Sequence, residues 1–221
     1  MEALFTVYKT KELISRAYWS FRRYYPDLPV TIVDNSGGGE CTEYIYHLLD
    51  LDANTNAIFN SKNEGHGDAL HMGINMSQSK YILIMDSDTE IRRYNLLEDM
   101  IKLMDDETYA VGRIVHTDLA GRSVNAKTPV ENIMDFILIY AMLLNRDMYY
   151  KFPKFTRFGL VNWKANYEMH KQGLSKKLLK NFPVTEYVYH VSGGTRAEYG
   201  DCEDIVDGFK GKKGDMFSEL D

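Results

Sequence analysis

Cysteine is scarce in this sequence: the 221 residues contain only Cys41 and Cys202, which lie far apart. Their number and spacing exclude a disulfide-rich scaffold and a metal site built on closely spaced cysteines, and they favour a reducing compartment. The first residues, Met1-Glu2-Ala3, carry no basic charge. We therefore expect no signal peptide and a cytoplasmic location.

Long hydrophobic runs and an excess of positive charge are absent as well. The longest apolar run, Phe136 to Leu144, is shorter than the roughly 20 residues that cross a bilayer, so we expect no membrane span. Lysine and arginine number 26 against 32 aspartate and glutamate, and the net charge of −6 does not favour nucleic acid as a partner. The 44% hydrophobic residues are ordinary for a soluble globular protein of one large or two small domains.

The first part of the chain alternates between apolar runs rich in β-branched or aromatic residues and segments with helical spacing. The runs are Ala3–Tyr8, Val30–Val33, Ala57–Asn60 and Tyr81–Met85, and the helical segments between them are Leu13–Phe21, Thr42–Leu49 and Ala69–Met76. This alternation predicts an α/β fold with a mostly parallel central sheet flanked by helices, doubly wound in its first half.

The second half is less regular. We expect helices at Leu96–Met104 and Val161–Gln172, strands at Tyr109–Val115 and Val184–His190, and an apolar helix or helix–strand junction at Ile133–Leu144. From Glu198 the chain is first acidic and then rich in glycine and lysine, which is typical of a linker. The expected organisation is one domain over residues 1–197, with halves at 1–90 and 91–197, and a linker-like tail at 198–221.

Asp86 and Asp88 directly follow the most apolar of these runs, Tyr81–Met85. A strand buried on both faces of a parallel sheet has such a continuous apolar pattern, and ligands bind in the crevice outside the carboxyl ends of these strands. Two carboxylates there suit Mn²⁺ or Mg²⁺, which usually accompany a phosphate-bearing substrate. The alternative is an Asx turn that only ends the strand.

Two further acids are candidate site residues, and the first of them, Asp34, is predicted at the same edge of the sheet as Asp86. Asp34 ends the second strand, where its carboxylate could accept a hydrogen bond from a base or a sugar, or could close a turn. Asp68 ends the segment Asn63–Asp68 before a helix, and the free amides of a helix start favour anionic partners. Asp68 could equally be the N-cap of that helix. We expect His66, in the same segment, to be a surface or packing residue.

His190 ends the last predicted strand and is followed by Gly193-Gly194-Thr195-Arg196. An imidazole can complete a carboxylate site for Mn²⁺, and glycine amides with an arginine can cradle a diphosphate. The alternative is a structural histidine at a strand end.

In their order and spacing, Asp34-Asn35-Ser36, Asn63-Glu64-Gly65, Tyr81–Asp88 and His190 resemble the nucleotide-sugar glycosyltransferases of the GT-A fold over nearly the whole chain. The Asp-x-Asp pair alone is nonspecific, so the ordered set carries the resemblance. The chain is also similar to the amino-terminal glycosyltransferase domain of multidomain enzymes with which large algal (chlorella) viruses build capsid glycans. That similarity implies a domain of a longer polypeptide, acting in the host cytoplasm.

The GT-A resemblance implies a Mn²⁺ or Mg²⁺ site that holds the diphosphate of the donor. Asp86 and Asp88 match its metal–diphosphate pair, and His190 matches a late metal ligand. Arg196 matches a diphosphate contact. The ion would stabilise the charge of the departing diphosphate.

The same resemblance implies how the rest of a UDP-sugar binds. Asp34 matches the residue that contacts the base, and Thr6 and Tyr8 match residues that pack around it. Asp68 and Asn162 match positions beside the donor sugar. The reaction implied is transfer of a hexose or deoxyhexose, such as glucose or rhamnose, to a hydroxyl group of a glycan or glycoprotein acceptor.

The catalytic base is where the sequence departs from the family pattern. Inverting members commonly carry an acid pair before a helix of the second half, but the comparable stretch Phe158–Glu168 has Glu168 as its only carboxylate. We take Glu168 as the candidate base, with Asp135 and Asp147 as alternatives. The missing acid pair favours a retaining mechanism, in which the leaving diphosphate accepts the proton of the acceptor.

Two other functions fit parts of the pattern. A nucleotidyltransferase that makes nucleotide-sugars would carry a glycine-rich loop with a basic residue after the first strand, whereas Tyr8–Lys11 offers lysines without glycines. A non-catalytic carbohydrate-binding module is compatible with the many aromatic residues. Metal-dependent binding of a nucleoside diphosphate would distinguish the enzyme from such a module.

Overall fold

The computed structural model of the chain describes residues 1–122, 124, 129–157 and 159–191, so Arg196 and the predicted tail at 198–221 lie outside it. Its strands are β1 (Glu2–Val7), β2 (Val30–Asp34), β3 (Thr55–Phe59), β4 (Tyr81–Asp86), β5 (Thr89–Ile91), β6 (Ala110–Gly112), β7 (Ile114–Asp118), β8 (Ile133–Ile137), β9 (Ala141–Asn145), β10 (Leu179–Asn181) and β11 (Val188–His190). Its helices are α1 (Lys11–Tyr24), α2 (Glu40–Leu51), α3 (His66–Met76), α4 (Leu96–Ile101), α5 (Arg146–Tyr149), α6 (Trp163–Lys171) and α7 (Ser175–Leu178), with 3-10 turns at Val130–Asn132 and Val184–Glu186. Among these helices, none has the length and hydrophobicity needed to span a membrane.

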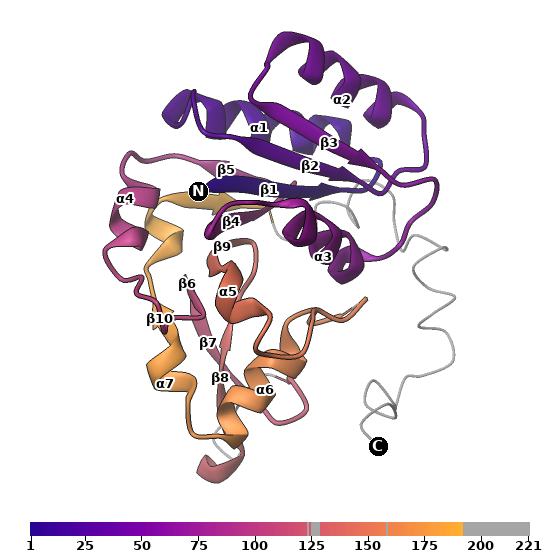
Figure 1. Cartoon of the computed structure of the whole chain (residues 1–221). Coiled ribbons are helices and arrows are strands. Elements are labelled where there is room, and N and C mark those ends of the chain that lie inside the picture. The colour runs from indigo at the N-terminus through magenta and orange to yellow at the C-terminus, as the bar shows by residue number, and fades with distance from the viewer. Residues whose placement is uncertain (123, 125–128, 158, 192–221) are drawn as a thin grey trace.

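The main sheet has seven strands in the order β10-β6-β9-β4-β1-β2-β3 (Figure 1). β1 pairs in parallel with β2 and β4, and β2 pairs in parallel with β3, whereas β9 runs antiparallel between β4 and β6. The predicted α/β fold with a mostly parallel central sheet flanked by helices is confirmed. The carboxyl ends of β1, β2 and β4 therefore meet at one edge, which is where open α/β sheets bind ligands.

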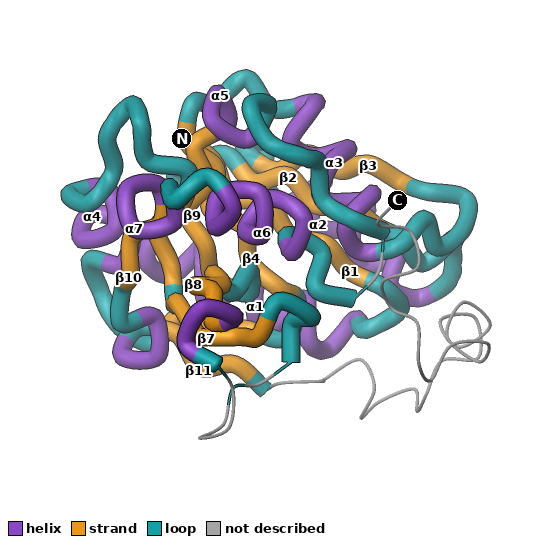
Figure 2. Tube along the Cα trace, turned by 90° about the horizontal axis from the view of Figure 1, so that it is seen from below, coloured by secondary structure: helices purple, strands orange, loops and turns teal. Residues whose placement is uncertain are grey.

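Helices cover both faces of this sheet, with α1 on one face and α3 on the other (Figure 1). Figure 2, seen from below, shows α6 in front of the sheet. Along β4, Leu83 and Met85 join the apolar cluster under α1, while Ile82 and Ile84 join the cluster that includes α3 and α6. Because successive side chains of a strand point to opposite faces, β4 is apolar at every position up to Asp86.

The prediction of an apolar helix or helix–strand junction at Ile133–Leu144 is wrong, because this run forms two strands. β8 pairs with β7 in a separate two-stranded sheet, and β9 inserts between β4 and β6. β9 is buried along its whole length, and a continuous apolar run does not distinguish a buried strand from a buried helix. The strand predicted at Val184–His190 is shorter than expected, since β11 begins only at Val188 after a 3-10 turn.

Candidate functional site

The turn after β4 and a short two-stranded sheet bring three of the predicted site residues together. β4 ends at Asp86, and Asp88 lies in the tight turn between β4 and β5. β5 pairs antiparallel with β11 so that His190 lies opposite Thr89, next to Asp88. The Nε2 atom of His190 is 3.1 Å from Oδ1 of Asp88.

The spacing of these side chains suits a single divalent ion. Asp86, Asp88 and His190 each offer one ligand atom, and these atoms all lie within 4.8 Å of one another. Ligand atoms about 2.1 Å from an octahedral ion lie about 3.0 Å apart when adjacent and about 4.2 Å apart when opposite. The Oδ1 atom of Asp86 is buried and has no hydrogen-bond partner among the described residues, and an ion would satisfy it. Two carboxylates and an imidazole therefore form a candidate metal site that fits Mn²⁺ or Mg²⁺.

The electrostatics of the site favour a positive charge at its centre. Burial lowers the pKa of His190, but the hydrogen bond with Asp88 and the charges of Asp88 and Asp86 outweigh it, so this pKa is raised above its ordinary value. The half-buried imidazole thus pairs with the carboxylate of Asp88 and feels the charge of Asp86 as well. A metal ion bound there would replace the proton on the imidazole, since a ligating histidine is neutral.

His66 also lies at the candidate site. The sequence predicted it only as a surface or packing histidine. It is the first residue of α3, and its Nε2 is 3.4 Å from Oδ1 of Asp86. The start of α3 is held there by the segment that follows Phe155. The amide of Gly67 donates to the carbonyl of Arg157 at 3.1 Å, and a Cβ at Gly67 would lie 1.8 Å from the carbonyl oxygen of Thr156. Only glycine allows this approach, which is the one local signal that α3 begins at a constrained place.

Parallel pairing brings the residues predicted to bind the base to the same edge. Thr6 lies opposite Asp86 in the β1–β4 register, and Asp34 lies at the end of β2. Asp34 is buried, and its Oδ1 accepts a hydrogen bond from the Ser36 amide at 2.8 Å. Its Oδ2 accepts the hydroxyl of Thr42. The turn that was the alternative for Asp34 is therefore present, and each carboxylate oxygen keeps a second lone pair for another donor. Tyr8 follows β1 and is partly exposed.

The sequence that forms this sheet and its acidic edge matches a known protein family. Residues 3–180 match the model of Glycosyl transferase family 2. The chain belongs to glycosyl transferase family 2. The predicted resemblance to GT-A fold glycosyltransferases is confirmed for family and fold. A search of curated proteins found none that matches the chain.

Solved structures share the fold of this family 2 domain. The mannosyltransferase PcManGT from Pyrobaculum calidifontis, in complex with GDP-Man and Mn2+, matches with a TM-score of 0.61 and 13% identity over 82% of this chain and 54% of that one. GalNAc-T7 with UDP, GalNAc and Mn2+ matches with a TM-score of 0.64 and 14% identity over 87% of this chain and 44% of that one. TarS 1-349 from S. aureus matches with a TM-score of 0.59 and 14% identity over 90% and 63%. The chain thus spans about half the length of the structures it matches, and the likeness concerns the fold.

Asp68 and Asn162, which are predicted beside the donor sugar, have partners within the family 2 domain. α3 begins at His66, so the alternative that Asp68 is its N-cap is wrong. Asp68 lies in the first turn, with its Oδ1 3.9 Å from Nζ of Lys154. Asn162 is buried, and its Nδ2 donates to the carbonyl of Ile137 at 2.6 Å, which fastens the start of α6 to β8. Contact of either side chain with a sugar stays a prediction.

The predicted catalytic base also has local partners. Glu168 lies on α6, and its Oε1 accepts a hydrogen bond from Nε2 of Gln172 at 2.8 Å. This hydrogen bond holds the pKa of Glu168 below its ordinary value, which makes the carboxylate a weaker base. Asp135, one of the alternatives, lies with its Oδ1 3.0 Å from Nδ1 of His116.

Proposed function

We propose that this family 2 domain is a metal-dependent glycosyltransferase that moves a hexose or deoxyhexose, of the glucose or rhamnose type, from a UDP-sugar to a hydroxyl group of a glycan or glycoprotein. The observation that carries the proposal is the cluster of Asp86, Asp88 and His190 at the carboxyl end of β4, with Asp34 at the end of β2 on the same edge of the sheet. Mn2+ and a nucleotide or nucleotide-sugar accompany the structures of PcManGT and GalNAc-T7, which supports Mn²⁺ as the ion and a nucleotide-sugar as the donor.

Each residue of the site has a part in binding the donor. Asp86, Asp88 and His190 would hold the ion, which supplies positive charge that stabilises the leaving diphosphate. Asp34 would accept an N–H of the uracil through its remaining lone pairs, with Thr6 and Tyr8 beside the base. In the transfer, the bond from the anomeric carbon to the diphosphate oxygen breaks, and a bond from that carbon to the acceptor oxygen forms. The acceptor proton passes either to the leaving diphosphate or to a side-chain base such as Glu168.

Product analysis with chelation tests this function. The full chain is incubated with glycan acceptors and a panel of nucleotide-sugars, with Mn²⁺ or with EDTA, and the products are examined by NMR. We expect transfer from a UDP-sugar only, its loss with EDTA and its return with added Mn²⁺. A retained anomeric configuration would indicate that the leaving diphosphate takes the proton of the acceptor hydroxyl. An inverted configuration would indicate that a side-chain base takes it. Formation of a UDP-sugar from UTP and a sugar phosphate would instead identify a nucleotidyltransferase, and glycan binding without UDP or metal a binding module.

Replacing Asp34 by alanine should weaken UDP binding about tenfold without removing its Mn²⁺ dependence, because a hydrogen bond to a charged group is worth about 1.5 kcal/mol or more. Calorimetric titration of UDP in the presence of Mn²⁺ measures the affinity. The matched control is Thr42→Val, which removes the hydroxyl that binds Asp34 and leaves the carboxylate in place. Unchanged UDP affinity in a folded Asp34→Ala protein would leave Asp34 as a turn residue only.

We further propose that residues 1–197 form the transferase domain, with a nucleotide-binding half at 1–90 and an acceptor-side half at 91–197, and that residues 198–221 link it to further chain. In a large algal virus, the product would be a glycan of the capsid protein made in the host cytoplasm. Arg196, which follows Gly193-Gly194-Thr195 in the sequence, would contact the diphosphate.

A further inference from the structure

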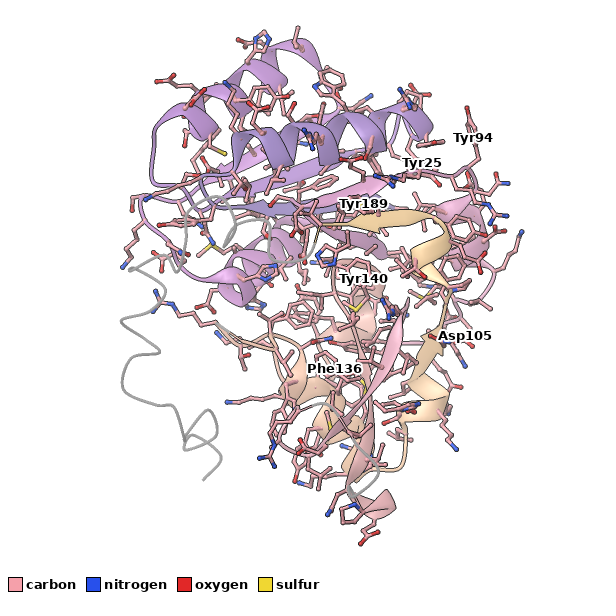
Figure 3. All side chains as sticks on the ribbon, turned by 180° about the vertical axis from the view of Figure 1, so that it is seen from behind. Tyr25, Tyr94, Asp105, Phe136, Tyr140 and Tyr189 are labelled. Atoms are coloured by element: carbon pink, nitrogen blue, oxygen red, sulfur yellow. The ribbon has the colours of Figure 1, made fainter. Side chains whose placement is uncertain are left out.

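Tyr140 contacts two residues of the candidate metal site, Asp86 and His190. It is the last residue of the turn between β8 and β9, and its backbone carbonyl accepts the amide of Asp86 at 3.1 Å. Its ring lies flat against the imidazole of His190, with 4.4 Å between the ring centroids and an angle of 7° between the planes. Figure 3 shows Tyr140 directly below Tyr189 on β11, the strand whose last residue is His190.

His190 needs support of this kind because its strand is short. β11 has three residues and pairs only with the three residues of β5 in the described part of the chain. A two-stranded sheet of that size is marginally stable by itself. The imidazole can also rotate about its side-chain bonds, and rotation would move Nε2 away from Asp88. A ligating histidine is usually fixed by contacts beyond the metal, and these contacts determine how well the site binds.

The ring of Tyr140 is itself fixed by packing. The side chain is 5% exposed and belongs to the same apolar cluster as Met85, Ile91 and Val188. These three residues lie on β4, β5 and β11, which are the strands that carry the ligands or flank them. The hydroxyl of Tyr140 is buried and has no hydrogen-bond partner among the described residues, so the hydroxyl does not hold the ring in place.

We propose that Tyr140 is a positioning residue of the metal site, whose ring orients the imidazole of His190 toward Asp88 while its carbonyl holds the backbone of Asp86. The inference rests on the metal site of the proposed function and deepens it, because it names a residue outside the ligand set that determines metal affinity. In this proposal the stacked ring of Tyr140 orients the imidazole, and its hydroxyl has no part in this.

A set of three variants tests the proposal, with Mn²⁺ alone as the probe and the full chain as the protein. Tyr140→Leu removes the ring, Tyr140→Phe keeps it without the hydroxyl, and Tyr109→Leu is the matched control. Tyr109 is also a buried tyrosine whose hydroxyl has no hydrogen-bond partner among the described residues, but its backbone carbonyl accepts the amide of Asn145, at the other end of β9. Mn²⁺ affinity is measured by EPR titration, and the melting temperature is measured in parallel.

We expect Tyr140→Leu to weaken Mn²⁺ binding about tenfold, as is typical when a contact that orients a ligand is lost. Tyr140→Phe should stay within about twofold of the wild type, and Tyr109→Leu should lower the melting temperature while Mn²⁺ affinity stays the same. If Tyr140→Leu does not fold, Tyr140→Met replaces it, with the same expected loss.

Three results would overturn the proposal. Mn²⁺ affinity that is unchanged in Tyr140→Leu, with only a lower melting temperature, would make Tyr140 a packing residue and leave the proposed function intact. A loss in Tyr140→Phe as large as that in Tyr140→Leu would show that the stacked ring is not the cause. Absence of Mn²⁺ binding in the wild type would remove the proposed metal-dependent function as well.

Discussion

Replacing Asp88 by asparagine should lower kcat/KM for transfer from the UDP-sugar about a thousandfold, because charge stabilisation by a bound ion is worth several kcal/mol. Asp88 is buried and its Oδ1 lies 3.1 Å from His190, so the amide keeps the size of the side chain and loses its charge. UDP binding should also lose its dependence on Mn²⁺. Steady-state kinetics over a series of Mn²⁺ concentrations measures both effects.

The control for this substitution is Asp106→Asn. Asp106 is highly exposed and pairs with Lys80 on the surface, so the same chemical change there should leave kcat/KM and Mn²⁺ dependence unaltered. If Asp88→Asn transferred sugar at the wild-type rate, Asp86 and Asp88 would be only turn residues at the end of β4. The melting temperature of each variant shows that the comparison is made between folded proteins.

The first half of the fold could be predicted because its elements are short, bounded and uniform in pattern. β4 is apolar on both faces and stops at two acids, so its burial and its end were both visible in the sequence. The parallel direction of the strands in the first half followed from the alternation with helices. Because parallel strands end at the same edge, the alternation also predicted that Asp34 and Asp86 share one edge of the sheet.

The second half was harder, because its apolar runs are ambiguous. Ile133–Leu144 contains the strands β8 and β9 with a turn between them, and the buried strand β9 is as apolar as a buried helix. The one-turn helices α5 and α7 are too short for helical periodicity to appear, and the sequence did not predict them.

The candidate site was predictable only where a residue ends a strand or lies in the turn directly after it. Asp86 and His190 end β4 and β11 and could be found in this way. His66 and Tyr140 contact these residues through the approach of α3 and of the β8–β9 turn. Gly67, next to His66, signals only that α3 begins at a constrained place, and no residue next to Tyr140 indicates its contact, because tertiary packing creates both contacts.

Replacing His190 by alanine should weaken Mn²⁺ binding about a hundredfold, because one of three ligand side chains is lost, and removing even an orienting contact costs ten- to a hundredfold. EPR titration with Mn²⁺ measures the loss, and UDP binding in the presence of Mn²⁺ should fall with it. The matched control is His116→Ala. His116 also pairs with an aspartate, with its Nδ1 3.0 Å from Asp135, but it lies on β7, outside the metal cluster.

The stability of the metal-free protein distinguishes His190 as a metal ligand from His190 as a structural residue. The pKa of His190 is raised in the folded protein, so its pairing with Asp88 contributes stability at pH values below the ordinary histidine pKa and loses it as pH rises through the raised value. His190→Ala should therefore lower the melting temperature of the metal-free protein at pH 5 and have little effect at pH 8 through this pair. Mn²⁺ binds best at the higher pH, where the imidazole is neutral. A loss of Mn²⁺ affinity at pH 8, with no loss of stability there, would assign His190 to the metal. A loss of stability at both pH values, with Mn²⁺ affinity unchanged, would leave it a structural residue.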